Sequence, residues 1–210
     1  MLERQLMTIL VSVPNFGGIS DVTERSIAEL RTPGIDLRRE DVKGYDATCA
    51  RNRIADILLK GDCTHVLMVD SDIELPKDAL QNLLDPSAPV VFGLYPKKRA
   101  EGIKFDCFRG KNPRGFVERV TPKYLAKSPD RIKVTGSGFG CALIERGVFE
   151  RLPFPWFCWR MFEGRHDMSE DLYFCEQAFK AGVDMYADKR VMCGHAITEA
   201  KITTVSVRYA

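Results

Sequence analysis

The chain has 210 residues, 45% of them hydrophobic and 29% charged, an ordinary composition for a soluble globular protein with one substantial core. Lysine and arginine total 31 against 29 aspartate and glutamate residues, so the charge balance does not indicate a nucleic-acid or membrane surface. No apolar run approaches the roughly 18 residues of a membrane-spanning helix.

Cysteine usage and the N-terminus point to an intracellular setting. The seven cysteines are scattered and include no C-x-x-C pair, which argues against a disulfide framework and against a structural zinc site. The N-terminus lacks a basic region followed by a signal-type apolar stretch. We therefore expect a cytoplasmic protein without stable membrane insertion.

The first half of the chain alternates expected strands and helices. In chain order we expect a strand over 7–13, a helix over 21–30 and a loop with at most one short strand over 32–45. A helix over 47–60, a strand over 64–70, a helix from 76 and a strand over 89–95 follow. The helices are predicted from their ends: Asp21 with Glu24 resembles a capping box, Gly61 is a stop, and Pro76 suits a first helical position. Such alternation favours a parallel α/β sheet with sites at the carboxyl ends of its strands.

The second half has a looser pattern. Residues 96–135 contain charges, prolines and short β-prone pieces such as 115–120. A glycine-rich segment over 136–140 then leads into an expected strand over 141–144, and a helix is predicted from Ser169 to about Ala181. No repeat or linker marks a second domain.

The expected strand over residues 64–70 ends in a pair of closely spaced carboxylates. Alternate residues of an extended chain point the same way, so Asp70 and Asp72 are expected to face one side across Ser71. Converging carboxylates are costly unless a cation neutralises them, and Mg²⁺ or Mn²⁺ takes such oxygen ligands beside substrate phosphates. The alternative is that either aspartate merely caps the next turn.

Further candidate side chains lie at element ends in the second half. Glu170 and Asp171 open a predicted helix, where negative charge is favoured, and the alternative is simple N-terminal capping. His195 follows the apolar segment 191–194 at the end of another expected strand, where a structural histidine is the alternative.

Five short segments, taken together and in this order, resemble the glycosyltransferases of the GT-A fold. The segments are Ala50-Arg51-Asn52, Asp70-Ser71-Asp72, the glycine-rich 136–140, Ser169-Glu170-Asp171 and Gly194-His195. The closest likeness is to the family 2 type of the nucleotide-diphospho-sugar transferase superfamily, and it extends from Ile9 to His195. The resemblance implies a single Rossmann-like α/β domain over 1–210, with a mixed, mainly parallel sheet flanked by helices. It also implies a nucleotide-binding half over about 1–95 and an acceptor and catalytic half over about 96–210.

The resemblance assigns the chemistry to particular residues. In similar enzymes the D-x-D binds Mn²⁺ or Mg²⁺ against the diphosphate of a nucleotide sugar, which corresponds to Asp70 and Asp72, and a late histidine completes the metal site, which corresponds to His195. The base that deprotonates the acceptor hydroxyl corresponds to Asp171, with Glu170 as its neighbour. The function implied is a metal-dependent, inverting transfer of a sugar from a nucleoside-diphosphate sugar to a hydroxyl.

The same resemblance places a nucleotide-sugar donor against the first half of the chain. Its implied contacts are Pro14 and Asn15 after the first strand, Arg51 and Asn52 in a helix, and Asp70 and Ser71 in the D-x-D. The D-D-G-S run common after the second strand is missing, so the nucleobase is left unassigned. The acceptor also stays open among a glycan, a small molecule and a modified nucleobase, and so does the oligomeric state.

Two other functions compete with glycosyl transfer. A nucleotidyltransferase shares the α/β sheet and the acidic metal site, but it normally carries a basic glycine-rich loop after the first strand, and residues 14–19 contain no lysine or arginine. The second alternative is an inactive GT-A module that binds a carbohydrate or a partner protein. The intact acidic motifs and His195 argue against that module.

Overall fold

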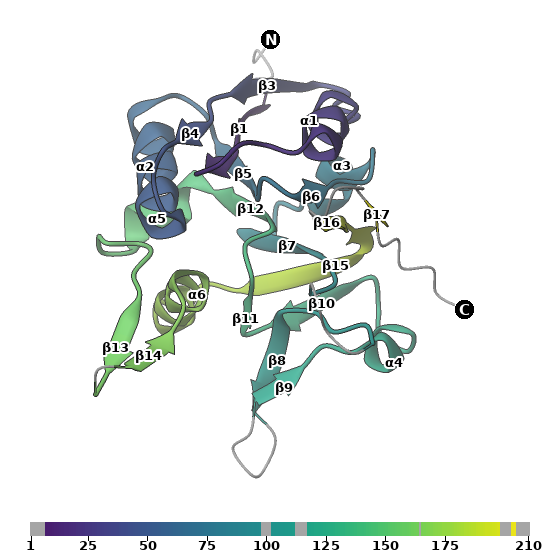
Figure 1. Cartoon of the computed structure of the whole chain (residues 1–210), viewed down its shortest axis with the longest axis vertical. Helices are drawn as coiled ribbons and strands as arrows, with labels where there is room; N and C mark the ends of the chain where they lie inside the picture. The colour runs from purple at the N-terminus through teal and green to yellow at the C-terminus, as the bar shows by residue number, and fades with distance from the viewer. Residues whose placement is uncertain (1–6, 98–101, 112–116, 164, 198–202, 205–210) are drawn as a thin grey trace.

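A seven-stranded sheet, in the order β10-β15-β7-β12-β5-β1-β3, runs through the centre of the protein (Figure 1). The computed structural model describes residues 7–97, 102–111, 117–163, 165–197 and 203–204. In chain order the strands of this sheet are β1 (Met7–Ser12), β3 (Ile35–Arg39), β5 (His65–Val69), β7 (Val90–Leu94), β10 (Arg131–Val134), β12 (Cys141–Glu145) and β15 (Met185–Met192). Valine, isoleucine, leucine and methionine dominate the central strands, as expected for strands buried on both faces.

The sheet is mixed, with three parallel and three antiparallel contacts. β1 pairs in parallel with β3 and β5, and β7 pairs in parallel with β15, whereas β12 is antiparallel to both of its neighbours and β10 is antiparallel to β15. The expectation of a mainly parallel sheet is therefore only partly met. β12 starts at the edge where β5 ends, because Cys141 lies opposite Val69 and Gly140 accepts a hydrogen bond from the Asp70 N–H (3.0 Å), so β12 runs in reverse.

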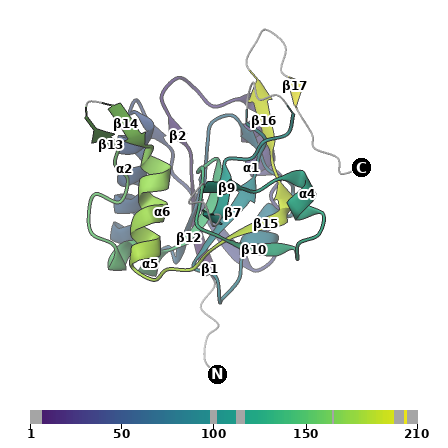
Figure 2. The same ribbon diagram turned by 90° about the horizontal axis from the view of Figure 1, so that it is seen from below.

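Helices cover both faces of this sheet (Figures 1 and 2). They are α1 (Asp21–Ala28), α2 (Ala47–Lys60), α3 (Ala79–Leu83), α4 (Pro122–Leu125), α5 (Arg146–Arg151) and α6 (Glu170–Lys180). One apolar cluster joins α2, α5 and α6 to Val66 and Met68 of β5, and a second joins α1 and α3 to Leu67 and Val69 of the same strand. The alternation of side chains along β5 thus divides the core into two layers.

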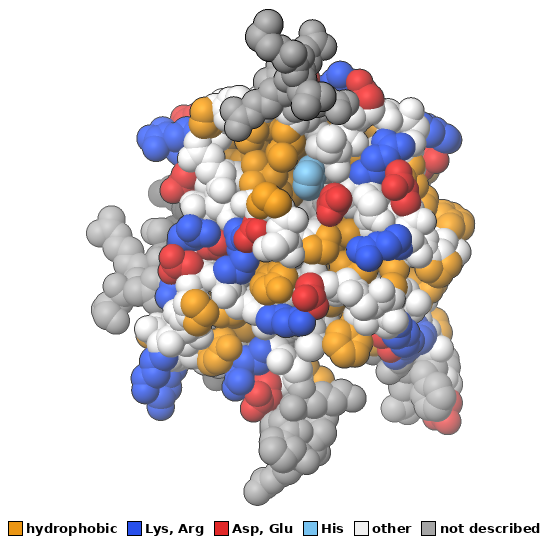
Figure 3. All heavy atoms as spheres, turned by 180° about the vertical axis from the view of Figure 1, so that it is seen from behind, with side chains coloured by type: hydrophobic (Ala, Val, Ile, Leu, Met, Phe, Trp, Pro, Cys, Tyr) orange, Lys and Arg blue, Asp and Glu red, His pale blue; other side chains and the backbone are white. Residues whose placement is uncertain are grey.

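Short strands frame the edges of the main sheet. β11 (Gly136–Ser137), β8 (Cys107–Lys111) and β9 (Val117–Arg119) form one small sheet. A second has the order β17 (Thr203–Thr204), β16 (Gly194–Ile197) and β6 (Ile73–Glu74). Two strand pairs complete the set: β13 (Arg160–Phe162) with β14 (Arg165–Met168), and β2 (Pro14–Asn15) with β4 (Val42–Lys43). On the face drawn in Figure 3, the described Lys and Arg side chains are interspersed with Asp and Glu side chains, as the balanced composition predicts. Among the described residues, no helix is both long and apolar enough to cross a membrane.

The structure has helices at the four predicted places, but α3 begins at Ala79, so the prediction that Pro76 is a first helical position is wrong. α2 has the predicted bounds, with the Asp46 carboxylate accepting hydrogen bonds from two N–H groups of its first turn. α1 begins at Asp21 as expected, but its N-cap is Ser20, whose Oγ accepts from the Thr23 N–H (3.3 Å), and Glu24 pairs with Arg39 instead of completing a capping box.

The prediction of at most one short strand within 32–45 is wrong. This segment contains β3, which extends the main sheet at one edge, and β4, which pairs with β2. β3 alternates the half-buried Ile35 and Leu37 with charged residues, because only one of its edges is paired and only one of its faces is partly covered. Its low apolar content concealed it from a search for buried strands.

Candidate functional site

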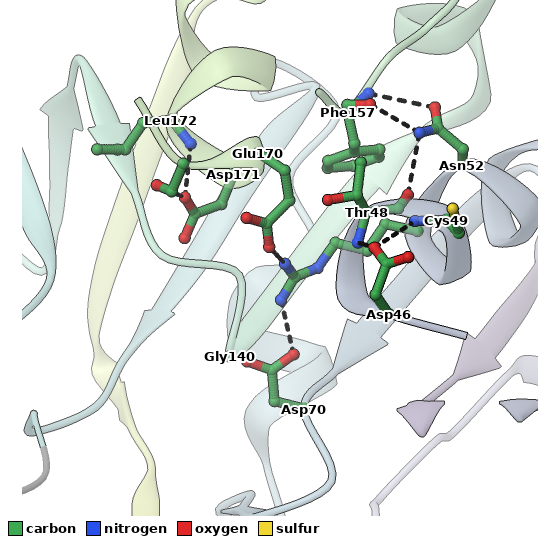
Figure 4. Close-up of polar contacts among 12 residues, drawn as sticks. Asp46, Thr48, Cys49, Asn52, Asp70, Gly140, Phe157, Glu170, Asp171 and Leu172 are labelled. Atoms are coloured by element: carbon green, nitrogen blue, oxygen red, sulfur yellow. Dashed lines mark hydrogen bonds and ion pairs between the residues drawn. The ribbon is translucent and has the colours of Figure 1, made fainter. Parts of the chain in front are cut away.

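The Arg51 guanidinium joins two acidic motifs that are about a hundred residues apart in the sequence (Figure 4). Its Nη2 donates to Asp70 Oδ1 at 2.8 Å, and its Nη1 donates to Glu170 Oε1. The Arg51 side chain is only 5% exposed, and its Cζ lies 5.6 Å from the centre of the Phe139 ring. We call Arg51, Asp70, Glu170 and the adjacent Asp171 the carboxylate centre.

Three element ends bring these side chains together. Asp70 follows the last residue of β5, and its N–H is fixed by Gly140 at the start of β12. Glu170 is the first residue of α6, after Ser169 in the extended N-cap position. Arg51 points from the first turns of α2, which the Asp46 cap orients. The centre therefore lies at the carboxyl end of a central strand, as the sequence predicts.

Desolvation and like charge raise the pKa values of the partly buried Asp70 and the buried Glu170. Burial raises the pKa of Asp70, Arg51 lowers it, and Asp72 and Asp171 raise it further, so that the net direction is upward. The pKa of Glu170 is also raised, first by burial and then by Asp171 and Asp70, against the lowering effect of Arg51. One guanidinium does not offset several carboxylates, which leaves an excess of negative charge that favours a bound cation.

Asp72 and His195 form a second pair beside this centre. His195 lies on β16 opposite Ile73 of β6, and its Nε2 is 3.5 Å from Asp72 Oδ1. His195 Nδ1 is 2.7 Å from the Pro96 carbonyl oxygen, which can only accept, so Nδ1 carries a proton. In the neutral imidazole, Nε2 then presents a lone pair toward a carboxylate oxygen, and a proton or a metal cation is needed between the two acceptors.

The predicted three-ligand metal site is not assembled in this structure. Asp72 and His195 are together, whereas Asp70 is turned toward Arg51. Within the described part of the chain, no three His, Cys, Asp or Glu side chains are grouped so that they could hold a metal ion. Asp72 and His195 supply one oxygen and one nitrogen donor, which suits a cation that completes its shell with substrate phosphate and water.

Asp171 has a different environment from its neighbour Glu170. Its Oδ1 accepts hydrogen bonds from Ser169 Oγ and from the Leu172 N–H (2.7 Å), and its side chain is partly exposed. It nevertheless acts on the pKa of both Asp70 and Tyr95, so it lies within the electrostatic reach of the carboxylate centre.

Tyr95 is a part of this region that sequence reasoning missed. Its hydroxyl accepts the Gly140 N–H at 3.3 Å, and burial together with Asp70 and Asp171 raises its pKa well above the usual value. A Cβ at Gly138 would lie 2.1 Å from the Tyr95 Oη, and a Cβ at Gly140 would lie 2.6 Å from its ring. The glycines of this segment therefore admit the Tyr95 ring, and no sequence signal links the two across more than forty residues.

The predicted donor residues after the first strand begin a loop whose far end contacts the D-x-D. Pro14 and Asn15 form β2, and the Asn15 side chain accepts the Gly18 N–H at 2.6 Å to hold the following turn. The Ser20 N–H donates to the Ser71 carbonyl at 2.9 Å, which ties the start of α1 to the acidic motif. The Ser20 contact places the end of the loop of residues 14–20 next to Ser71 of the D-x-D.

Asn52 has a structural role in the fold. Its amide donates to the Thr48 carbonyl (3.0 Å) and the Phe157 carbonyl (2.7 Å), and its oxygen accepts the N–H groups of Trp156 (3.1 Å) and Phe157 (3.2 Å). It therefore fastens α2 to the segment between α5 and β13 (Figure 4).

The chain resembles a solved structure over nearly its whole length. The crystal structure of A197 from STIV matches it with a TM-score of 0.66 over 97% of both chains at 20% sequence identity. No protein-family model and no curated protein matches the chain. At this level of identity the similarity establishes the mixed α/β fold and leaves the activity to be argued from the site.

We expect the Arg51→Met variant to lose about 3–5 kcal/mol of unfolding free energy at pH 7.5, because the buried Glu170 and the partly buried Asp70 lose their cation. Both carboxylates already have raised pKa values in the folded protein, and loss of Arg51 raises them further. A raised folded-state pKa penalises the ionised form, so the penalty is full above that pKa and disappears as the pH falls below the unfolded value. The destabilisation should therefore be clearly smaller at pH 4.5.

Urea unfolding at both pH values checks this expectation. Arg53→Met is the matched control, since Arg53 lies on the same helix but is largely exposed, and its removal should leave the stability nearly unchanged. Equal losses in the two variants, or a loss in Arg51→Met that does not depend on pH, would contradict the role assigned to Arg51.

Proposed function

We propose that this protein is a metal-dependent glycosyltransferase of the GT-A type, which moves a sugar from a nucleoside-diphosphate sugar to an acceptor hydroxyl with inversion. One observation carries the proposal: the carboxylates of the D-x-D and E-D motifs meet around Arg51, with the Asp72–His195 pair beside them. The fold supports it, because this arrangement lies at the carboxyl end of a central strand of a mixed α/β sheet.

Asp72 and His195 are the residues that would hold Mn²⁺ or Mg²⁺. The Pro96 carbonyl fixes the His195 ring by its Nδ1 proton, which is how a metal-ligating histidine is commonly oriented. When bound, the cation would stabilise the negative charge that grows on the departing diphosphate. Asp70 would remain an electrostatic neighbour of that site while it stays hydrogen-bonded to Arg51.

The environments of the two helix-start acids favour Asp171 as the base. Glu170 is buried, and its Oε1 accepts a hydrogen bond from Arg51, so this side chain is held inside the fold. Asp171 is partly exposed and keeps one oxygen outside the hydrogen bonds to Ser169 and Leu172 described above. In the proposed step the acceptor oxygen bonds to the anomeric carbon, the bond to the diphosphate oxygen breaks, and the hydroxyl proton passes to Asp171.

Arg51 acts in this proposal as a positioning residue. The sequence resemblance places it near the nucleoside, but both of its terminal nitrogens donate to carboxylates, and its side chain is buried. The donor contacts are therefore assigned to the loop after the first strand, at Pro14 and Asn15, together with Ser71.

A nucleoside diphosphate should raise the melting temperature much more with Mn²⁺ than with EDTA, because only the folded protein binds the metal complex. Thermal shifts with UDP, GDP, ADP and CDP measure this effect and identify the preferred nucleobase. Asp72→Asn should remove most of the Mn²⁺-dependent part. Asp62→Asn changes an exposed acid before the opposite end of β5 and should retain it. Nucleotide stabilisation that is the same with and without metal would count against the assignment.

Transfer should fall by roughly 10²–10⁴-fold in Asp171→Asn, the usual range for loss of a general base, with nucleotide affinity nearly unchanged. The substitution keeps the shape and removes the basicity. Product formation from a nucleotide sugar, measured beside the thermal shift, separates chemistry from binding. Full activity in Asp171→Asn together with loss in Glu170→Gln would move the base to Glu170, and a product with retained anomeric configuration would refute the inverting mechanism.

A further inference from the structure

A cavity of about 760 Å³ is lined by residues of α6 and of the small sheet formed by β8, β9 and β11. Figure 1 shows where these elements lie. Its apolar lining comes mainly from Phe108, Val117, Met168, Leu172 and Phe179. Val117 and Phe179 are 56% and 64% exposed, so large apolar side chains stand at its rim. Neither the fold nor the carboxylate centre requires this cavity, whose size is that of a small-molecule site.

The charged side chains of the lining already have partners. Arg119 donates to Asp106 at 2.7 Å and stacks over the Phe108 ring, 4.5 Å from its centre. Glu176 pairs with Arg160 (2.9 Å) and Lys180 (3.1 Å). Recruiting either charge for a ligand would break these pairs, so the lining favours an uncharged occupant.

The neutral polar groups of the lining are also engaged. Thr135 Oγ1 donates to the Phe108 carbonyl at 3.2 Å, and the Cys175 thiol donates to the Ser137 carbonyl at 3.7 Å. Burial raises the pKa of Cys175, so its thiol stays neutral. The cavity therefore offers its occupant apolar contact and little polar recognition.

Asp171 belongs to the carboxylate centre and adjoins Leu172, which lines this cavity. Met168 and Leu172 flank it in sequence, and both line the cavity. Its charge acts on Cys175 in the cavity wall and also on Asp70 and Tyr95 in the centre. A molecule seated in the cavity thus lies beside two carboxylates: Glu176 in the lining, which is paired with Arg160 and Lys180, and Asp171, the residue assigned as the base, which adjoins the lining residue Leu172.

We propose that the cavity binds the uncharged apolar body of the acceptor, a small hydroxylated aromatic or alicyclic compound whose hydroxyl is presented to Asp171. This inference rests on the proposed glycosyl transfer and names the class of acceptor. The acceptor oxygen bonds to the anomeric carbon of the donor sugar, the nucleoside diphosphate leaves with the electrons of its broken bond, and Asp171 takes the hydroxyl proton.

Binding is tested first without nucleotide or metal, with Nile red as an uncharged apolar fluorophore. We expect one saturable site whose affinity falls at least about tenfold in the Val117→Gln/Phe179→Gln double variant, because the apolar rim is lost. Phe154→Gln is the control, since Phe154 is 71% exposed and does not line the cavity, and it should bind as the original protein does. Both rim side chains are exposed, so the double variant should fold. Equal Nile red affinity in the double variant and the original protein would overturn the inference.

The second arm tests the hydroxyl. Naphthol should displace Nile red and, with a nucleotide sugar and Mn²⁺, should become glycosylated, whereas glycerol should do neither. Asp171→Asn should abolish transfer and keep the Nile red affinity within about twofold, because the apolar contacts remain. Transfer to glycerol but not to naphthol would overturn the inference and leave the proposed function standing. Naphthol binding with no transfer from any nucleotide sugar would overturn the acceptor assignment together with the proposed function and leave an apolar ligand site.

Discussion

One buried guanidinium determines how the parts of this site are arranged. Burying the Arg51 charge is tolerable only while Asp70 and Glu170 stay within hydrogen-bond distance, because an unpaired buried ion costs several kcal/mol. The pair of contacts therefore couples the end of β5, the first turns of α2 and the start of α6. Asn52 adds a connection between α2 and the segment that joins α5 to β13. A shift of any one of these elements would leave a buried charge without its partner, so the geometry of the acidic motifs is rigidly specified.

The same arrangement leaves more negative than positive charge among the side chains of the site. Arg51 lowers the pKa of Asp70 and Glu170, yet burial and neighbouring carboxylates raise both pKa values overall. Because His195 Nδ1 donates to the Pro96 carbonyl, His195 Nε2 faces Asp72 Oδ1 as an acceptor in the neutral imidazole. A proton or a metal cation is then needed between these two atoms. Both features favour a cation at the outer side of the centre, and a cation held by few protein ligands leaves positions for the oxygens of an anionic substrate.

Local signals in the sequence predicted the parts of the site that local chemistry determines. The capped helix over 47–60, the helix opening at Glu170 and the acidic motif after a buried strand are each encoded within a few residues, and the structure has all three. The edge strand β3 was missed because it is half-buried and half-charged. The carboxylate centre around Arg51 was not predictable, because the hydrogen bond from Arg51 to Glu170 depends on the packing of segments 119 residues apart. The fit of Tyr95 over Gly138 and Gly140 was missed for the same reason.

The two surroundings of Asp171 imply different kinds of selectivity for the two substrates in the proposed reaction. On one side lie charges and fixed hydrogen bonds, which discriminate strongly because a wrong partner leaves buried polar groups unpaired. On the other side lies an apolar cavity whose polar groups already have partners. Apolar contact separates ligands by only about 1–3 kcal/mol for each methylene-sized difference. The proposed enzyme would therefore be strict toward its nucleotide-sugar donor and tolerant among uncharged acceptors of similar shape, with the position of the hydroxyl relative to Asp171 deciding which of them react.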